Sequence, residues 1–172
     1  DVDIKTVTAG PNPWDVAFIN FRYTDSQNHY YFLIKTDGTL ELSKWKNGIQ
    51  YWLVEKPSAY SPFNWNRIKV DTTGGNIKIY VNSILEIDYT DLDPLTQGKI
   101  GLAPYYCHAH FDNVNVQDKN QAQGDTSGEW VGILGRNWQS NIEIRLEEDP
   151  TTGNVAVYKE EGIKEVHTKN AD

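Results

Sequence analysis

The sequence predicts an all-β fold, an antiparallel β-sandwich of the jelly-roll type, and three observations support this prediction. Apolar and polar residues alternate with a period of two through most of the chain, as in half-buried strands. Turn-forming residues separate these segments at intervals of about 8–12 residues, the spacing typical of sandwiches and barrels. No segment has the periodicity of an amphipathic helix.

The first expected strand runs from Ala17 to Tyr23, where Ile19 and Phe21 alternate with Asn20 and Arg22. The pairs Asp37-Gly38 and Asn47-Gly48 are strong signals for tight hairpin turns. Seven further strands are expected at His29–Lys35, Thr39–Lys46, Ile49–Glu55, Trp65–Asp71, Ile77–Val81, Ile84–Tyr89 and Lys99–Ala103, and an eighth at Ala109–Val116. Together these segments predict a jelly-roll core over residues 1–116.

The chain changes character after this core. Residues 117–128 are rich in Gln, Asp, Asn, Gly and Ser, which predicts a linker or long surface loop. Residues 129–172 form a C-terminal β-hairpin block with strands expected at Trp130–Leu134, Asn141–Glu147, Val155–Lys159 and Ile163–His167. The block is too small to hold a core of its own, so we expect it to pack on the sandwich.

Composition and charge narrow the classes of partner. The formal net charge is −8, which disfavours nucleic acid and anionic membranes, and no apolar run is long enough for membrane insertion. Cys107 is the single cysteine, so an intrachain disulfide is impossible. The sequence begins with Asp1 and contains no Met, so we expect a processed or excised piece of a longer product, consistent with export.

Four groups of residues carry a resemblance to a known superfamily. They are Phe21–Asp25 with Asn28–Phe32; Asp37–Leu42 and the hairpin ending at Asn47-Gly48; Trp65–Val70 with Ile77–Asn82; and Gly98–Leu102 with Phe111–Val116. In this order the segment 1–116 resembles the concanavalin A-like lectin/glucanase superfamily, closest to its laminin G-like and keto-disaccharide hydrolase branch. The resemblance implies a jelly roll with one concave sheet face and an extracellular or cell-surface location.

A sugar site is expected on that concave face. Alternation points Asn20 and Arg22 into the groove, with Arg67 in the same class and Tyr31, His108 and His110 as neighbours. Polar side chains of this kind bind hydroxyl groups directionally, and aromatic rings offer flat platforms. The expected platforms are Trp14, Trp52, Tyr105 and Tyr106; for each Trp the alternative is core packing, and for Arg22 it is a structural salt bridge.

The sequence offers two candidate metal sites. In related jelly-roll modules an Asp that begins the closing strand helps to hold a structural calcium, which the resemblance transfers to Asp112 with Asp1 or Asp3 as partners. The alternative is that Asp112 caps a turn. His108 and His110 share a strand face with Asp112, a spacing that can chelate zinc or copper, although a polar strand edge explains it as well.

The sequence gives less support for catalysis than for sugar binding. The β-glucanases of the superfamily carry a Glu-x-Asp-x-Glu strand, and the nearest segment here, Glu143–Glu147, has Arg145 in place of the middle carboxylate. An ion-pairing strand face explains that segment better. No Ser/His/Asp or Cys/His arrangement emerges from the sequence.

The sequence therefore predicts a non-catalytic, lectin-like carbohydrate-binding module of a secreted or surface protein. Its partner would be a polysaccharide or glycan. The first alternative is a structural or adhesive subunit that associates with its neighbours through sheet edges. Two expectations motivate it: the strand pair that the family usually has before the position of Asp1 is missing here, and additional strands follow at the C-terminal end. An incomplete sandwich leaves strand edges that can pair with a neighbour. The second alternative is a glycoside-active jelly-roll enzyme.

Overall fold

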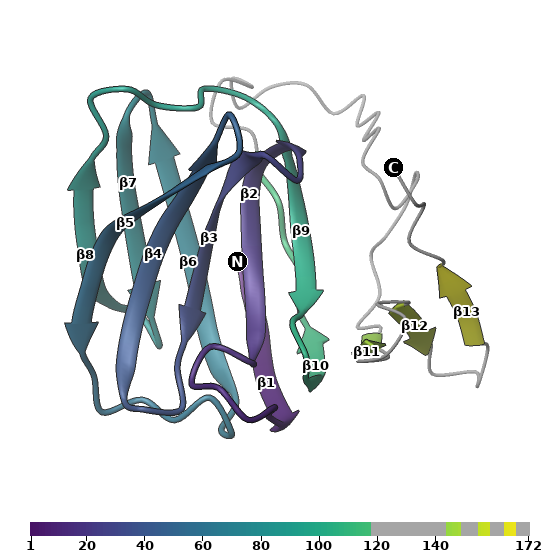
Figure 1. Cartoon of the computed structure of the whole chain (residues 1–172). Coiled ribbons are helices and arrows are strands. Elements are labelled where there is room, and N and C mark those ends of the chain that lie inside the picture. Colours follow the sequence, from purple (N-terminus) through teal and green to yellow (C-terminus); the bar gives the residue numbers. More distant parts are fainter. Residues whose placement is uncertain (118–143, 149–154, 159–163, 168–172) are drawn as a thin grey trace, which may run out of the picture.

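The computed structural model describes residues 1–117, 144–148, 155–158 and 164–167, and these residues form an antiparallel β-sandwich (Figure 1). The strands are β1 (Val2–Thr8), β2 (Ala17–Asp25), β3 (Asn28–Ile34), β4 (Thr39–Lys46), β5 (Ile49–Pro57), β6 (Asn66–Thr73), β7 (Asn76–Val81), β8 (Ile84–Thr90), β9 (Lys99–Pro104), β10 (His108–Asp112), β11 (Ile144–Glu148), β12 (Val155–Tyr158) and β13 (Lys164–His167). Within the described ranges, no helix is long and apolar enough to cross a membrane.

The strands divide into two sheets. Sheet A has eight strands in the order β13-β12-β11-β10-β1-β6-β7-β8. Sheet B has five strands in the order β5-β4-β3-β2-β9 and lies in front of sheet A in Figure 1. The chain crosses repeatedly between the sheets, so strands that are neighbours in sheet A come from distant parts of the sequence. The all-β sandwich expected from the sequence is confirmed.

The first strand, β1, was not predicted, yet it lies near the middle of sheet A between β10 and β6. Val2, Ile4 and Thr6 are buried, whereas Asp3 and Lys5 point away from the core. The alternation was therefore present in the sequence, but only over a short segment at the chain start.

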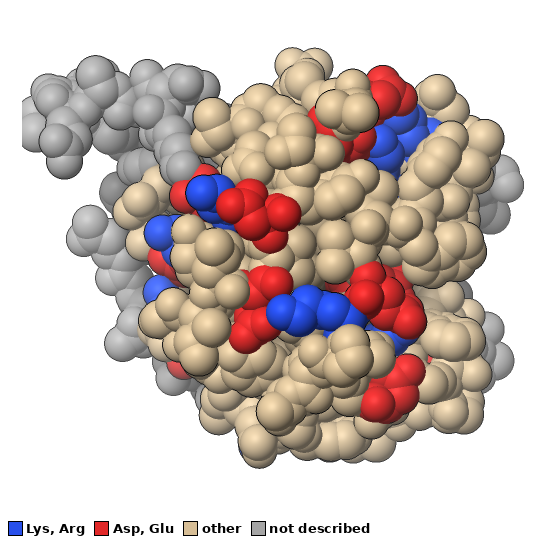
Figure 2. Space-filling view, turned by 90° about the vertical axis from the view of Figure 1, so that its left-hand side faces the viewer, with Lys and Arg blue, Asp and Glu red and all other residues tan. Residues whose placement is uncertain are grey.

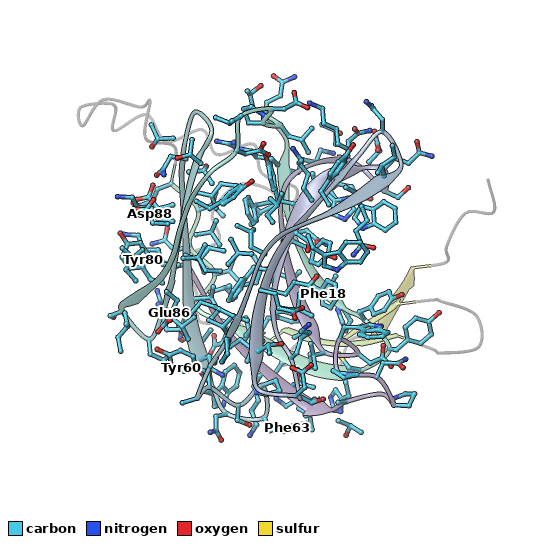
Figure 3. All side chains as sticks on the ribbon, turned by 60° about the vertical axis from the view of Figure 1, so that its left-hand side comes forward. Phe18, Tyr60, Phe63, Tyr80, Glu86 and Asp88 are labelled. Atoms are coloured by element: carbon cyan, nitrogen blue, oxygen red, sulfur yellow. The ribbon has the colours of Figure 1, made fainter. Side chains whose placement is uncertain are left out.

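The core fills the space between the two sheets, as the edge-on view in Figure 3 shows. The fully buried side chains with the largest volumes are Tyr30, Phe32, Phe111, Leu33, Ile34, Leu40, Leu42, Ile68, Ile77, Ile79, Val16 and Val81. Most of these residues belong to alternating strand positions, so burial of one side of each strand leaves the other side available for different chemistry.

Both predicted hairpin turns have the backbone that their residues favour. Gly38 has φ of 83°, and Asn47 and Gly48 have φ of 52° and 75°. The strand between them, β4, has the predicted bounds. At the other end of the core, β10 stops at Asp112, short of the predicted Val116, because Asn113 adopts φ of 50° and donates its backbone N–H to Asp112 Oδ1 at 2.6 Å.

Ion pairs join the two sheets along the side formed by β5 and β8. Lys56 Nζ lies 2.7 Å from Glu86 Oε2, and the hydroxyl of Tyr60 donates to Glu86 Oε1 at 2.8 Å. Figure 2, which looks onto this side, shows positive and negative groups next to each other rather than in separate patches. The surface therefore lacks the basic patch that a nucleic-acid partner requires on the face shown.

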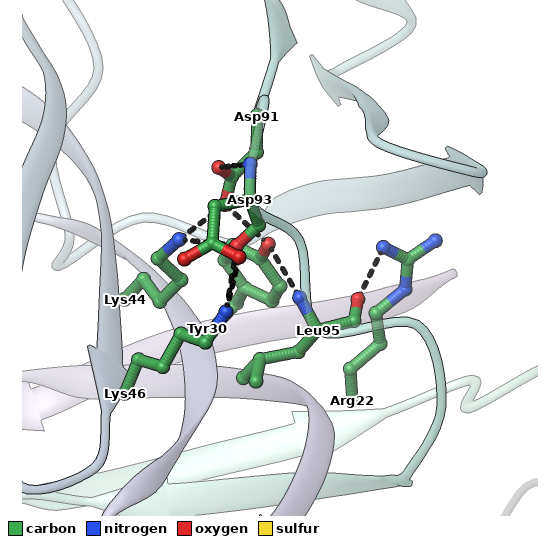
Figure 4. Close-up of polar contacts among 7 residues, drawn as sticks. All are labelled: Arg22, Tyr30, Lys44, Lys46, Asp91, Asp93 and Leu95. Carbon is green, nitrogen blue, oxygen red and sulfur yellow. Dashed lines mark hydrogen bonds and ion pairs between the residues drawn. The ribbon is translucent and has the colours of Figure 1, made fainter.

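A buried polar cluster secures the connection from β8 to β9 (Figure 4). Lys44 Nζ lies 2.6 Å from Asp91 Oδ2, and the Tyr30 hydroxyl donates to the same carboxylate oxygen at 2.5 Å. The Tyr30 oxygen in turn accepts the backbone N–H of Leu95 at 3.1 Å. The cluster ties the loop after β8 to sheet B from inside the sandwich.

The C-terminal strands extend sheet A beyond β10. Strand β11 pairs with β10 from Phe111 opposite Ile144 to His108 opposite Glu147, and β12 and β13 follow in order. Three of the four strands predicted after residue 128 are therefore present, and they continue sheet A by edge pairing. The predicted strand Trp130–Leu134 and the linker from residue 118 lie outside the described residues, and the domain boundaries remain predictions.

Candidate carbohydrate-binding face

The side of sheet B that points away from the core carries a row of mixed polar and aromatic residues; we call this side the outer face. Strand register places one residue of each strand in line across it: Trp52, Ser43, Tyr31, Asn20 and Gly101. The neighbouring positions on the same side include Gln50, Glu55, Glu41, Trp45, His29, Tyr23 and Phe18. This composition differs from the apolar inner side of the same strands.

Hydrogen bonds connect the centre of the outer face. The Tyr31 hydroxyl donates to Glu41 Oε1 at 3.0 Å, and Ser43 Oγ donates to the same oxygen at 2.8 Å. Gln50 Nε2 donates to the Tyr31 oxygen at 2.5 Å. Tyr31, Glu41 and Ser43 are all buried. We call these three residues with Gln50 the polar floor, since exposed rings flank them.

Protonation states in this region follow from burial. Burial and the charge and hydrogen bond of Glu41 raise the pKa of Tyr31 to about 12, so its hydroxyl remains a donor at neutral pH. Lys35 lies 3.3 Å from Glu41 and 2.6 Å from Glu55. Burial alone would lower the pKa of Lys35, but these carboxylates outweigh it and raise the pKa, so Lys35 stays charged. Burial lowers the pKa of His29, which favours its neutral form.

Aromatic rings border the polar floor. Phe18, labelled in Figure 3 outside sheet B, stacks on Tyr31 with ring centroids 5.2 Å apart, and Tyr105 lies 5.3 Å from Phe18. Trp52, from the opposite margin, has 66 % of its surface exposed, and Tyr105 has 41 %. Exposed rings on both sides of a buried polar centre match the usual lining of a small-molecule or glycan site.

Asn20 lies in the same row, beside Gly101. In the part of the chain that the structure describes, Asn20 Oδ1 is buried and has no hydrogen-bond partner. Such an acceptor is normally satisfied by water or by a ligand hydroxyl. Asn20 and Tyr31 therefore lie together as the sequence predicted, since they are direct cross-strand partners.

The predicted place of Arg22 is wrong. The strand register shifts after Asn20, and Arg22 itself has φ of 49°, so the alternation breaks there. Its guanidinium donates to the carbonyl of Leu95 at 2.7 Å, in the loop that precedes β9 (Figure 4). Tyr23 takes the outward position instead, with its ring 5.1 Å from that of His29.

Three other predicted residues belong to the opposite sheet. Arg67 lies on β6, where its Nη1 contacts Asp3 Oδ1 at 3.2 Å. His108 and His110 share one side of β10, with ring centroids 5.2 Å apart, and His110 lies 6.2 Å from Trp65. These residues cannot share a face with Asn20, because sheet A and sheet B present their polar sides in opposite directions.

Two of the predicted platforms lie in loops. Trp14, in the connection between β1 and β2, has 47 % of its surface exposed, and Tyr106 has 45 %. Tyr106 follows Tyr105 and meets it edge to face at 4.8 Å. Of the four predicted platforms, the contacts link Tyr105 to the outer face through Phe18, and register links Trp52 to it through Ser43.

The sequence prediction missed Glu41, Ser43, Gln50 and Phe18. Their signal was the alternation of Leu40 and Leu42 with Glu41 and Ser43 in β4, which marks the side that does not face the core. Of β4 and β5 the prediction named Trp52 alone. A predicted hairpin does not give the exact register between its strands, and register decides which side chains share a face.

The residues proposed for calcium lie close together but are already paired. Asp3 and Asp112 are opposite each other on β1 and β10. Asp3 contacts Arg67 through one oxygen and accepts from Asn113 Nδ2 at 2.7 Å through the other, while Asp1 lies 3.8 Å from Arg67. Among the described residues no group of three or more His, Cys, Asp or Glu side chains is arranged to hold a metal. This donor set, with a guanidinium at its centre, does not fit calcium.

Comparison with known proteins gives one informative result. No family model matches this chain, and no curated protein is similar to it. Among solved structures, the carbohydrate-binding module CBM66 from Bacillus subtilis is similar, with a TM-score of 0.55 and 23 % identity over 64 % of this chain and 68 % of that chain. At this identity the likeness shows the fold, which is a β-sandwich jelly roll consistent with the concanavalin A-like resemblance.

Proposed function

We propose that this protein is a non-catalytic carbohydrate-binding module and that the outer face of sheet B binds the glycan. The observation that carries the proposal is the polar floor bordered by exposed rings. Tyr31, Ser43, Glu41 and Gln50 supply donors and acceptors in a fixed network, while Trp52 and Tyr105 supply flat apolar surface. The fold likeness to a carbohydrate-binding module supports the proposal.

The contacts of the Glu41 carboxylate favour a role in binding over a role in catalysis. Its carboxylate accepts from Tyr31 and Ser43 and pairs with Lys35. These contacts engage both oxygens of the Glu41 carboxylate, so neither can act as nucleophile or general base without losing a partner. Glycoside hydrolysis also needs a second carboxylic acid held in its protonated form. On the outer face, the second carboxylate, Glu55, lies 2.6 Å from Lys35 Nζ.

The first experiment measures binding of the purified protein to a panel of soluble polysaccharides: neutral glucans, xylans, mannans and fructans, and acidic alginate and polygalacturonate. Trp52→Ala should lower the affinity for the best polysaccharide about tenfold or more, since exposed Trp side chains dominate contacts of this type. Trp65→Ala is the matched control, because Trp65 is 45 % exposed and lies directly before β6 of sheet A, near His110.

Two outcomes would count against the proposal. If no polysaccharide of the panel binds, or if Trp65→Ala weakens binding as much as Trp52→Ala, the outer face of sheet B is not the site. Measuring reducing ends in the same samples tests the enzyme alternative, which predicts that they increase with time.

The proposed module would act outside the cell, as the resemblance implies. The alternative of a structural subunit loses one of its arguments, because β1 pairs on both sides and β11 covers the free edge of β10. Light scattering against protein concentration tests it: a constant monomer mass would remove self-association through sheet edges.

A further inference from the structure

The two exposed rings of the outer face lie at its opposite margins. Trp52 belongs to β5 and Tyr105 directly follows β9, and these are the two edge strands of sheet B. Neighbouring strands are about 4.8 Å apart, so four intervals separate the margins by about 19 Å. This span is much longer than one sugar ring, so a single ring cannot contact both side chains.

Polar side chains lie beneath the whole width between the margins, with Ser43 fully buried and Tyr31 5 % exposed. Register aligns Ser43, Tyr31 and Asn20 between Trp52 and the β9 margin. At that margin the row ends in Gly101, where a Cβ atom would lie 3.4 Å from Asn20 Cβ. The glycine keeps the margin low, so a chain that lies over the floor can continue past β9 without meeting a side chain of this row.

The charges of the floor are compensated within the protein. Lys35 contacts both Glu41 and Glu55, so its ammonium group is already engaged by two carboxylates. Arg22, which the sequence placed on this face as a second cation, instead donates a hydrogen bond to the carbonyl of Leu95. The neutral form of His29 adds no charge. The polar floor itself therefore offers no cation to a uronate or sulfate group, and the exposed carboxylate of Glu55 beside it repels anions. The exposed Lys99 lies outside the floor, opposite Tyr23 at the β9 margin.

From this geometry we infer that the outer face binds an internal stretch of an uncharged glycan chain, several sugar units long, that crosses sheet B from β5 to β9. The inference rests on the proposed function. Trp52 and Tyr105 stack on different sugar units. Gln50, the residue of the polar floor that is not buried, binds hydroxyl groups between them and is held in place by Tyr31. A chain end is not required, because among the described residues the row ends in the exposed Trp52 on β5 and in Gly101, which has no side chain, on β9.

The test uses the mono-, di- and longer oligosaccharides of the neutral polysaccharide that binds best in the panel. Calorimetry measures their affinity for the wild type, Trp52→Ala, Tyr105→Leu and the double variant. Leucine keeps the apolar contact of Tyr105 with Phe18 but removes the flat ring, and thermal unfolding confirms that each variant is folded. Trp65→Ala again serves as the control.

We expect the affinity of the wild type to rise with oligosaccharide length and then level off. Each single variant should lose about tenfold affinity for the long oligosaccharides, and the two losses should multiply in the double variant, because the side chains are far apart. For the shortest sugar, at most one of the two substitutions should matter.

Three results would overturn the inference. Equal affinity for the monosaccharide and the longest oligosaccharide would show a single subsite. Loss with Trp52→Ala but none with Tyr105→Leu would confine binding to the β5 margin. Equal binding of alginate or polygalacturonate would exclude selection for uncharged chains. In each case the protein still binds a glycan, whereas absence of all binding rejects the proposed function itself.

Discussion

At the scale of single residues, two ion pairs of similar chemistry differ in how deeply they are buried. Lys44 and Asp91 form an ion pair whose side chains are 5 % and 6 % exposed, with Tyr30 as a third partner. Lys46 and Asp93 form a second pair nearby, in which the Asp93 side chain is 79 % exposed. The two pairs come from neighbouring segments but differ in burial. Comparing them therefore shows how much burial, rather than charge alone, contributes to the free energy of unfolding.

Asp91→Ala should destabilise the protein by about 3–5 kcal/mol, because it leaves the Lys44 ammonium buried without its counter-charge. Asp93→Ala should change the free energy of unfolding by less than about 1 kcal/mol, as for exposed ion pairs. Urea denaturation measures both. Equal losses in the two variants would contradict the role assigned to the buried cluster.

The same carboxylate predicts a loss of stability in acid. Burial alone would raise the pKa of Asp91, but hydrogen bonds from Lys44, Tyr30 and the Asp93 N–H outweigh it and lower the pKa. A carboxyl group whose folded-state pKa lies below its unfolded value of about 3.9 stabilises the fold at neutral pH and loses that contribution as pH falls below about 4. Urea denaturation between neutral and acid pH should show the decline, with a smaller decline in Asp91→Asn. An unchanged pH dependence in that variant would assign the decline to other carboxylates.

The pairing of Asp3 with Arg67 leads to a prediction about calcium. Since the guanidinium already balances Asp1 and Asp3, we expect a chelator to leave both the melting temperature and glycan binding unchanged. Differential scanning fluorimetry with calcium and with chelator measures the first. A higher melting temperature in calcium that is lost in Asp3→Asn would restore the calcium site expected from the resemblance.

At the scale of elements, β2 shows how one irregular residue changes a face. The register shift at Arg22 turns Tyr23 outward, and Gly98 fits closely against the same point of the strand. A Cβ atom on Gly98, which has φ of 140°, would lie 2.4 Å from the carbonyl carbon of Arg22. The irregularity in β2 and the glycine before β9 therefore depend on each other.

Gly98→Ala should destabilise the protein by about 1–3 kcal/mol more than Gly74→Ala, because it adds a backbone clash to an unfavourable φ. Gly74 also has a positive φ, 55°, but nothing lies within 4 Å of its would-be Cβ atom. Thermal and urea denaturation measure the difference. If the two variants lose the same stability, the close contact with Arg22 does not constrain the strand.

Sequence alone was sufficient where local chemistry determines the structure. The turns at Gly38 and Asn47-Gly48 determine β4, whose predicted bounds are confirmed. It was insufficient at Arg22, because the bulge depends on Gly98, which is distant in sequence. It also placed Arg67 on the wrong face, since alternation states which residues share a side of one strand but not which strands share a sheet.

At the scale of the whole molecule, the proposed glycan site and the C-terminal strands belong to different sheets. Sheet A carries the additional C-terminal strands next to β10, whereas the outer face of sheet B lies on the opposite side of the core. The C-terminal strands thus extend the sheet that does not carry the proposed glycan site.

The single thiol of the chain provides a chemical probe of local opening in this sandwich. Cys107 is 7 % exposed and lies where the chain passes from β9 in one sheet to β10 in the other. An alkylating reagent reaches its sulfur only when the two sheets separate at this corner, so the labelling rate reports the free energy of that opening. Any glycan that binds the closed form should slow the labelling in proportion to its concentration above Kd, and the rate would then measure affinity without a chromophore or a tag.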